Sequence, residues 1–217
     1  DDSKDCFSQQ GKNGALSYLL IEKAMPLFLS ESMVIDMNKI LETERLYLRR
    51  LHDDDSDRLY EMMRDPKTMY AYEHGFSKAE TKEWLKRQLD RYAAYGFGLW
   101  AVILKESGEL IGQCGITMQD YREHQVMEIG YVFDRHFWQN GYAGEAAYAC
   151  REYGFEVLQA DALYSMIRDN NLASICVAKH NQMRCVDTIC KYYYHMNMPH
   201  YVYRITKQEW LSLREKA

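Results

Sequence analysis

The stretch from Val126 to Val157 constrains the fold of this chain more than any other. Residues 126–133 are strand-like, residues 138–144 form a turn rich in small side chains, and residues 143–157 have helical periodicity. The first backbone N–H groups of a helix have no partner within it, and the helix dipole favours negative charge there. A strand, such a turn and a helix N-terminus therefore predict a site for a phosphate-bearing cofactor. An ordinary tight connection between strand and helix is the alternative.

The turn matches neither of two well-known phosphate-binding motifs. No Gly-Lys-Ser/Thr sequence follows it, which excludes a Walker-type P-loop. Its glycines also lack the G-x-G-x-x-G spacing of dinucleotide-binding folds. Taken alone, a turn of this kind is weak evidence for phosphate binding, so its ligand has to be inferred from the rest of the sequence.

Length and composition fit one globular domain with an extension. The chain has 217 residues, of which 47% are hydrophobic and 27% charged. We divide it into an N-terminal extension at residues 1–40, partly flexible and not necessarily native, and a domain at residues 41–217. The longest apolar stretch, residues 15–29, carries Glu22 and Lys23 and is too short and too charged to span a membrane.

Net charge and cysteine content limit the classes of binding partner and the cellular compartment that we expect. The net charge of −5 argues against nucleic acid as the main partner, since such affinity depends on Lys and Arg, and it fits a cationic substrate better. None of the cysteines forms a C-x-x-C pair, and several lie in apolar patterns. We therefore expect buried, reduced thiols in a cytoplasmic protein and no metal site.

Hydrophobic periodicity and turn signals predict the order of elements. Strands are expected near residues 46–51, 99–104, 110–118, 126–133, 162–167, 183–194 and 201–206. Helices are expected at residues 59–63, behind a capping box at residues 77–80, at residues 143–157 and at residues 172–179. Hairpins imply antiparallel pairing, whereas the strand–helix–strand unit at residues 126–167 implies one parallel pair. The fold class is mixed α/β, with helices flanking a largely antiparallel, twisted sheet.

Several short motifs occur in an order that is typical of one enzyme superfamily. Together they resemble the GNAT acetyltransferase superfamily, and in particular its RimJ/RimL branch, which acetylates protein N-termini and related amines. The resemblance covers residues 41–205. The motifs are Leu41-Glu42-Thr43-Glu44-Arg45-Leu46, Gly112-Gln113-Cys114-Gly115, Glu128-Ile129-Gly130-Tyr131, Trp138-x-x-Gly141-Tyr142-Ala143-x-Glu145-Ala146 and Asn171-x-x-Ser174.

The resemblance implies a sheet that splays between its fourth and fifth strands and holds acetyl-CoA in the notch as a cosubstrate. The pyrophosphate would meet backbone N–H groups of the turn, and the pantetheine arm would pair with the edge of the fourth strand and contact Asn171. Trp138 stands where the superfamily usually has Gln or Arg, so a basic side chain is absent there. The cofactor-binding residues implied in this way are Tyr131, Val132, Phe133, Trp138, Gln139, Asn140, Gly141, Tyr142, Ala143, Gly144 and Asn171.

Acetyl transfer to an amine needs a base for the amine proton and benefits from an acid for the leaving thiolate. Glu128, on the strand beside the notch, is the candidate base, although an ion-paired or solvated carboxylate is the alternative. Ser174 is the candidate acid, because Ala178 stands where several relatives have a tyrosine; a helix cap is its alternative role. No cysteine has an evident histidine partner, which favours direct attack over an acyl-enzyme.

Gln182 is a second departure from the superfamily pattern, because relatives usually have glycine just after this helix. Glycine adopts a left-handed conformation freely, so glutamine must adopt it at some cost or close the helix differently. We expect a locally altered turn without loss of activity.

The acceptor site is the part that sequence determines least. Tyr72, Glu73 and Tyr194 are candidate lining residues, because aromatic rings with a carboxylate suit an ammonium group; plain packing is the alternative. We predict an N-acetyltransferase that transfers acetyl from acetyl-CoA to a primary amine by direct attack, with a protein N-terminus as one possible acceptor. The alternatives are acetylation of a small amine or antibiotic, or a non-catalytic acyl-CoA-binding module on the same fold. Dimers are common on this fold, but nothing in the sequence requires a homodimer.

Overall fold

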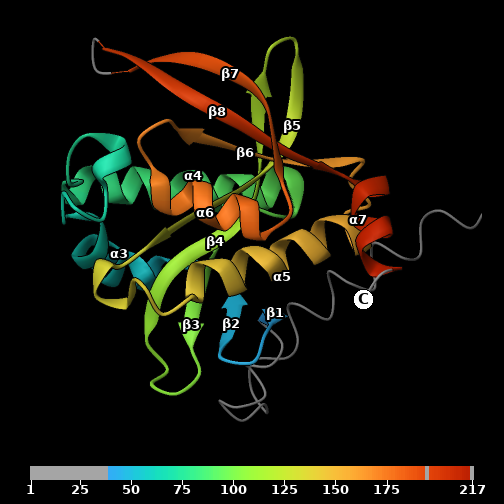
Figure 1. Cartoon of the computed structure of the whole chain (residues 1–217). Coiled ribbons are helices and arrows are strands. Elements are labelled where there is room, and N and C mark those ends of the chain that lie inside the picture. Colours follow the sequence, from blue (N-terminus) through green and yellow to red (C-terminus); the bar gives the residue numbers. More distant parts are fainter. Residues whose placement is uncertain (1–38, 194–195, 216–217) are drawn as a thin grey trace, which may run out of the picture. The chain divides into compact units, whose positions relative to one another are not determined.

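A computed structural model describes residues 39–193 and 196–215 (Figure 1). The predicted extension at residues 1–40 therefore lies outside the described residues, except for its last two positions. The strands are β1 (Lys39–Glu42), β2 (Leu46–Arg49), β3 (Leu99–Leu104), β4 (Leu110–Tyr121), β5 (His124–Phe133), β6 (Ala162–Arg168), β7 (Arg184–Tyr193) and β8 (Met196–Thr206). The helices are α3 (Ser56–Met63), α4 (Lys78–Tyr95), α5 (Tyr142–Glu156), α6 (Leu172–His180) and α7 (Lys207–Arg214), with 3-10 turns η1 (Asp53–Asp55), η2 (Tyr70–Tyr72) and η3 (Arg135–Phe137). No helix in the described residues is long and apolar enough to cross a membrane.

The sheet has eight strands in the order β1-β2-β3-β4-β5-β6-β8-β7. All neighbouring strands are antiparallel except β5 and β6, which are parallel. The predicted mixed α/β class and the parallel pair are therefore confirmed. The sequence analysis did not predict β1 or α7, and β8 begins at Met196, before the predicted start at residue 201. The sequence does carry a signal for α7, because Thr206 and Glu209 exchange the hydrogen bonds of a capping box at its start.

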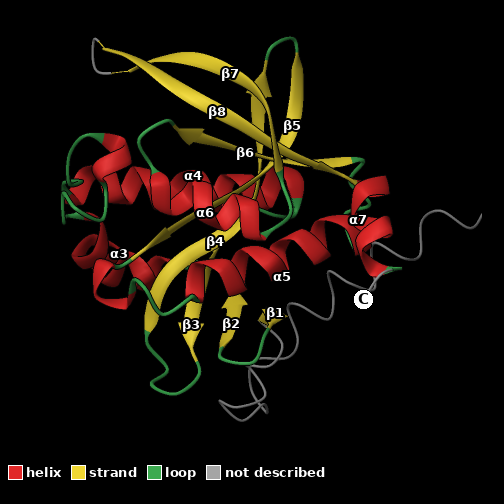
Figure 2. Cartoon of the chain, in the orientation of Figure 1, coloured by secondary structure: helices red, strands yellow, loops and turns green. Residues whose placement is uncertain are grey.

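Helices α4 and α5 cover opposite faces of the sheet (Figure 2). On α4, the Trp84 indole Nε1 donates to Gln113 Oε1 on β4 at 2.9 Å. On α5, Cys150 Sγ lies 3.5 Å from Cys114 Sγ, also on β4. Gln113 and Cys114 are consecutive residues of one strand, so their side chains point to opposite faces. The core is thus divided into two layers, one on each side of β3, β4 and β5.

Strands β5 and β6 separate shortly after they meet. β5 pairs with β4 along its whole length, from His124 opposite Tyr121 to Phe133 opposite Gly112. Its pairing with β6 is confined to Glu128 opposite Tyr164. Beyond Glu128 the edge of β5 that faces away from β4 has no strand beside it. The predicted fourth and fifth strands, at residues 126–133 and 162–167, correspond to β5 and β6, so the predicted splay between them is confirmed. The splay leaves backbone hydrogen-bonding groups of β5 without a partner strand.

Helix α6 ends in a left-handed turn at Gln182, which has a φ of 61°. The Gln182 N–H donates to the Lys179 carbonyl at 2.9 Å, and the Met183 N–H donates to the Ala178 carbonyl at 3.0 Å. These bonds satisfy helix carbonyls that would otherwise lack partners. The sequence left open whether Gln182 adopts the left-handed conformation or the helix closes differently, and the chain adopts the left-handed conformation although glutamine has a Cβ.

Replacing Gln182 with glycine should raise the free energy of unfolding by about 1 kcal/mol, because glycine has no Cβ to oppose the left-handed conformation. Urea unfolding measures the change. As a matched control, Gln208→Gly removes the same side chain from within α7 and should lower stability by about 1 kcal/mol. A Q182G variant that is no more stable than the parent chain would contradict this description of the turn.

Candidate active site

The backbone before α5 forms the turn that the sequence predicts to bind an anion, called the anion-binding turn below. Gln139 and Gly141 have left-handed φ values of 64° and 80°, and Gly141 directly precedes the right-handed residues of α5. A left-handed residue beside a right-handed one turns successive N–H groups toward one concave side. The first bond of the α5 ladder runs from the Glu145 N–H to the Gly141 carbonyl at 3.0 Å. The N–H groups of Tyr142 and Gly144, and of the residue between them, therefore precede the ladder and have no acceptor within the helix.

An ion pair ties this turn to the segment between β1 and β2. Arg45 Nε and Nη2 both lie 2.7 Å from Glu145 Oε2, in the first turn of α5. Arg45 Nη1 also donates to the Asn140 carbonyl at 2.9 Å. Burial raises the pKa of Glu145, but hydrogen bonds from Thr43 and Arg45 outweigh that effect and leave the pKa below its ordinary value. The carboxylate is thus charged and holds the turn in place.

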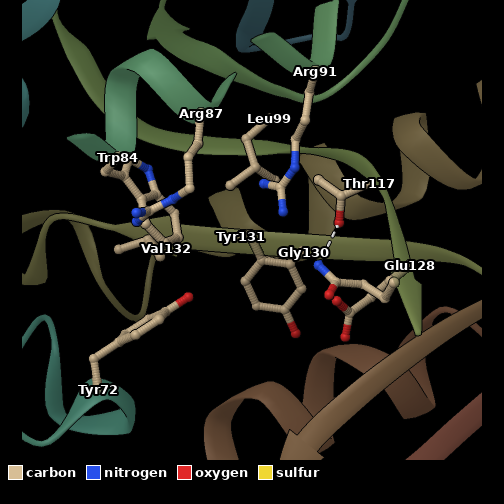
Figure 3. A pocket seen from close by; sticks show the side chains of 11 residues that line it. Tyr72, Trp84, Arg87, Arg91, Leu99, Thr117, Glu128, Gly130, Tyr131 and Val132 are labelled. Atoms are coloured by element: carbon tan, nitrogen blue, oxygen red, sulfur yellow. Dashed lines mark hydrogen bonds between the residues drawn. The ribbon is translucent and has the colours of Figure 1, made fainter. Parts of the chain in front are cut away.

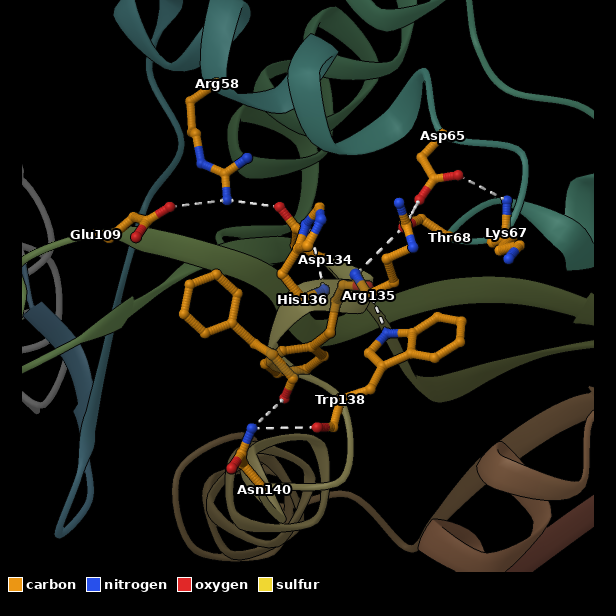
Figure 4. A network of polar contacts seen from close by, with 12 residues as sticks. Arg58, Asp65, Lys67, Thr68, Glu109, Asp134, Arg135, His136, Trp138 and Asn140 are labelled. Carbon is orange, nitrogen blue, oxygen red and sulfur yellow. Dashed lines mark hydrogen bonds and ion pairs between the residues drawn. The ribbon is translucent and has the colours of Figure 1, made fainter.

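Further polar contacts fix the segment that leads from β5 into the turn (Figure 4). Asp134 accepts from Arg58 Nη2 at 2.7 Å and from the His136 N–H at 3.0 Å. The Trp138 indole Nε1 donates to the Phe133 carbonyl at 2.8 Å, while the Asn140 amide donates to the Trp138 carbonyl at 3.1 Å. The indole N–H is therefore bonded to this chain's own backbone, and Trp138 shapes the turn from within.

The open edge of β5 exposes few backbone groups. The Ile129 carbonyl faces β6, where it accepts from Ser165 Oγ at 2.9 Å, and the Phe133 carbonyl faces Trp138 on the same side. Backbone direction alternates along a strand, so Tyr131, between them, turns both its N–H and its carbonyl to the opening. By the same alternation Val132 faces β4. Of the residues that the resemblance assigns to this edge, Tyr131 is thus the best placed to pair with an extended ligand.

Glu128 lies where β5 and β6 part, and its Oε1 accepts from the Met166 N–H at 2.8 Å. Burial raises the pKa of this carboxyl above its ordinary value of 4.5, against the lowering effects of the Lys191 charge, the Met166 N–H and the Arg91 charge. A carboxylate with one oxygen bonded and a raised pKa can accept a proton near neutral pH. This arrangement is what a general base requires.

The start of α6 adjoins the same region. Asn171 caps the helix, because its Oδ1 accepts from the Ser174 N–H at 3.0 Å. The Tyr131 hydroxyl donates to the Ser174 carbonyl at 3.2 Å, and burial raises the pKa of this tyrosine. The Ser174 hydroxyl makes no hydrogen bond to the residues that the structure describes. The candidate acid is thus free to reach a ligand, and Tyr131 is a second hydroxyl beside it.

A cavity of about 150 Å³ opens beside Glu128 (Figure 3). Its walls come from η2, α4, β3, β4 and β5. Tyr72, one of the predicted acceptor residues, lines it, whereas Glu73 pairs with Arg168 and is not part of the lining. Tyr194 lies outside the described residues. The lining includes Tyr72, Leu99, Thr117, Gln119, Glu128 and Tyr131.

Two arginines that the sequence analysis missed also line the cavity. They are Arg87 and Arg91 on α4, and in Figure 3 both project from the helix into the space above β5. A signal exists in the sequence, because Trp84, Arg87 and Arg91 have the i, i+3, i+7 spacing of one helix stripe. Only knowledge of what the stripe packs against could show that it borders a cavity.

Two expectations about cysteine need correction. Cys114 and Cys150 are buried, but Cys176, Cys185 and Cys190 are exposed, since their positions lie on α6 and on β7 at the edge of the sheet. Cys176 also has a histidine partner, with His180 Nδ1 at 3.4 Å one turn along α6. Because both residues are on the exposed side of the helix and outside the cavity lining, direct attack remains the favoured route. No set of three metal-binding side chains gathers within residues 39–193 and 196–215.

Comparison with a protein-family model matches residues 45–184 to the acetyltransferase (GNAT) domain. YkkB of Bacillus subtilis, an uncharacterised protein, is 40% identical over 153 residues, which is 70% of this chain and 89% of that protein. The family-model match spans the turn, β5, β6 and α6.

Solved structures show the same fold. An acetyltransferase of the GNAT family from Bacillus anthracis superposes with a TM-score of 0.67 and 26% identity, covering 78% of this chain and 99% of that one. The ribosomal alpha-N-protein acetyltransferase RimL, solved in complex with coenzyme A, superposes with a TM-score of 0.64 and 16% identity, covering 79% and 99%.

Proposed function

Because this chain belongs to the GNAT acetyltransferase family, we propose that its domain at residues 41–217 transfers acetyl from acetyl-CoA to a primary amine. The observation that carries the proposal is the parting of β5 from β6 at Glu128, with an anion-binding turn at one end and a carboxylate-lined cavity at the other. The five motifs also support placement in the RimJ/RimL branch.

The residues present fit the acetyl donor. The pyrophosphate would accept from the backbone N–H groups of Gln139 to Gly144, the pantetheine arm would pair with Tyr131, and Asn171 would donate from its Nδ2. Room exists for this ligand, since a Cβ added at Gly144 would have no neighbour within 4 Å. A Cβ added at Gly130, in the cavity wall, would meet Leu99 at an ordinary 3.6 Å. Packing within the chain would thus allow a side chain at both positions, so their lack of one is consistent with space kept for a ligand.

The chain's own groups supply the proton transfers. The amine nitrogen attacks the thioester carbonyl, a C–N bond forms and the C–S bond breaks. Glu128 accepts the proton that the nitrogen loses. The Ser174 hydroxyl, with the Tyr131 hydroxyl as second candidate, gives a proton to the departing thiolate and regains one from solvent. A non-catalytic acyl-CoA-binding module could use the Glu128 carboxylate only as an acceptor for the Met166 N–H, whereas transfer also uses its raised pKa, so we favour transfer.

A thiol-release assay with acetyl-CoA tests this assignment when the parent chain is compared with Glu128→Gln. The substituted amide keeps an oxygen for the Met166 N–H, so stability should change little while the base is lost. We expect kcat/KM to fall by about 100-fold or more. The parent should lose activity as pH falls through the raised pKa of Glu128, which lies above 4.5, because protonation removes the base; the variant should lack this limb. An unchanged rate and pH profile would mean that Glu128 is not the base.

Substitutions at two glycines of α5 test ligand binding and stability separately. Gly144→Ala should stabilise the free chain by about 0.5 kcal/mol, because alanine favours helix, yet it should weaken coenzyme A binding by about tenfold by crowding the turn. In the control, Gly154→Ala puts a Cβ 2.8 Å from Leu163, which should lower stability and leave the binding constant of the folded chain unchanged. Urea unfolding and calorimetric titration measure the two effects. Equal binding by G144A and the parent would exclude the turn as the pyrophosphate site.

A further inference from the structure

The cavity beside Glu128 has a positive wall that forms no ion pair with the described chain. Arg87 and Arg91 are one turn apart on α4 and both line the cavity. Most other arginines of the described residues pair directly with carboxylates, as Arg45 does with Glu145 and Arg49 with Asp55, although Arg50 and Arg204 do not. Within the described residues, no carboxylate forms an ion pair with Arg87 or Arg91. Two such guanidinium groups at one cavity are suited to an anion from outside the chain.

Neutral groups hold the two side chains in place. Arg91 Nη1 donates to Gln88 Oε1 at 3.1 Å, and Gln88 is fully buried. The Arg87 guanidinium lies over the Trp84 ring, 5.5 Å from its centroid. Burial and the charge of Arg87 lower the pKa of Arg91, and together they outweigh the raising effect of the Glu128 charge across the cavity. The chain therefore holds Arg91 through a neutral partner, while the exposed Arg87 lies against Trp84, and neither guanidinium is bonded to a carboxylate of the described residues.

The strand register places Arg91 far from the phosphate site. Arg91 shares the cavity with Thr117, and Thr117 lies opposite Glu128 in the β4–β5 pair. The anion-binding turn begins only after Phe133, which lies about 17 Å from Glu128 along β5 at about 3.3 Å per residue, although the cavity itself reaches along β5 to Val132. The arginines also come from α4, which covers the face of the sheet opposite α5. An anion bound by them is thus not the pyrophosphate of acetyl-CoA.

The size of the cavity limits what part of an acceptor it holds. Its volume of about 150 Å³ is below the range of about 300–1,000 Å³ that is typical of pockets for whole small-molecule ligands. That space suits the amine and one small neighbouring group. With the amine nitrogen at Glu128, the neighbouring group lies toward Arg91 and Arg87.

We propose that the acceptor carries a carboxylate close to its reacting amine, so that Glu128 receives the amine and Arg87 and Arg91 bind the carboxylate. This inference rests on the proposed acetyl transfer. A free amino acid or a peptide with an acidic first residue supplies the same chemistry. It replaces the expectation, drawn from net charge and from Glu73, that the acceptor is simply cationic.

Matched acceptors test the proposal with the full chain and saturating acetyl-CoA. Alanine is compared with alaninamide, and a peptide that begins with Asp with one that begins with Asn, with thiol release as readout. At least one carboxylate-bearing member should exceed its neutral partner in kcat/KM by about tenfold or more, as expected for a charge-assisted hydrogen bond. A preference for alanine over alaninamide identifies a free amino acid as the acceptor. A preference for the Asp peptide over the Asn peptide identifies a peptide with an acidic first residue.

Variants link the preference to the two arginines. The double variant Arg87→Gln/Arg91→Gln should lose the preference, measured as the ratio of kcat/KM between the two members of each acceptor pair, while Arg91→Lys should retain part of it. This ratio cancels any effect that the lost charge has on Glu128, because both acceptors use the same base. The control Lys86→Gln removes one charge from an exposed position of α4 and should leave the preference unchanged. Thermal unfolding verifies that each variant is folded.

The outcomes separate this inference from the proposed function. Equal or faster transfer to alaninamide, the Asn peptide and spermidine would overturn the acceptor assignment and leave acetyl transfer intact. A preference that survives in the double variant would overturn the role of the arginines. Bound acetyl-CoA without thiol release to any amine would overturn both.

Discussion

Beyond Glu128, β5 keeps β4 as a neighbour and loses β6, and the rest of the site depends on this change of partners. Ladder hydrogen bonds give way to bonds from single groups: Ser165 donates its hydroxyl to the Ile129 carbonyl, and the Met166 N–H goes to the Glu128 side chain. These contacts close the apex of the opening. The same geometry exposes the Tyr131 backbone and sets a carboxylate beside it, so the proposed binding and the proposed proton transfer have one structural cause.

The opening is bordered by segments that are distant in the sequence. Arg45 holds the anion-binding turn through Glu145, and Trp138 secures the end of β5 through the Phe133 carbonyl. On the other face, α4 presents Arg91 bonded to the buried Gln88 amide and Arg87 over the Trp84 ring. Each border is fixed by bonds within the chain, so the site is largely formed before a ligand arrives.

Local signals predicted the elements well, and long-range packing decided the rest. The capping box at Ser77 and Glu80 and the parallel pair at β5 and β6 follow from spacing and connection rules, and both were predictable. Arg91 was not, because a helix stripe shows which side chains share a face but not which cavity that face meets. Glu73 shows the same limit: its carboxylate suited an ammonium group in sequence, yet the fold pairs it with Arg168.

Residue-resolved amide hydrogen exchange, with and without saturating acetyl-CoA, tests the central claim most directly. If the open edge of β5 and the turn before α5 form one binding surface, exchange should slow at Tyr131 and across residues 139–144, and should stay unchanged along β7. Protection confined to other elements, or unchanged exchange at both Tyr131 and the turn with ligand bound, would contradict the account.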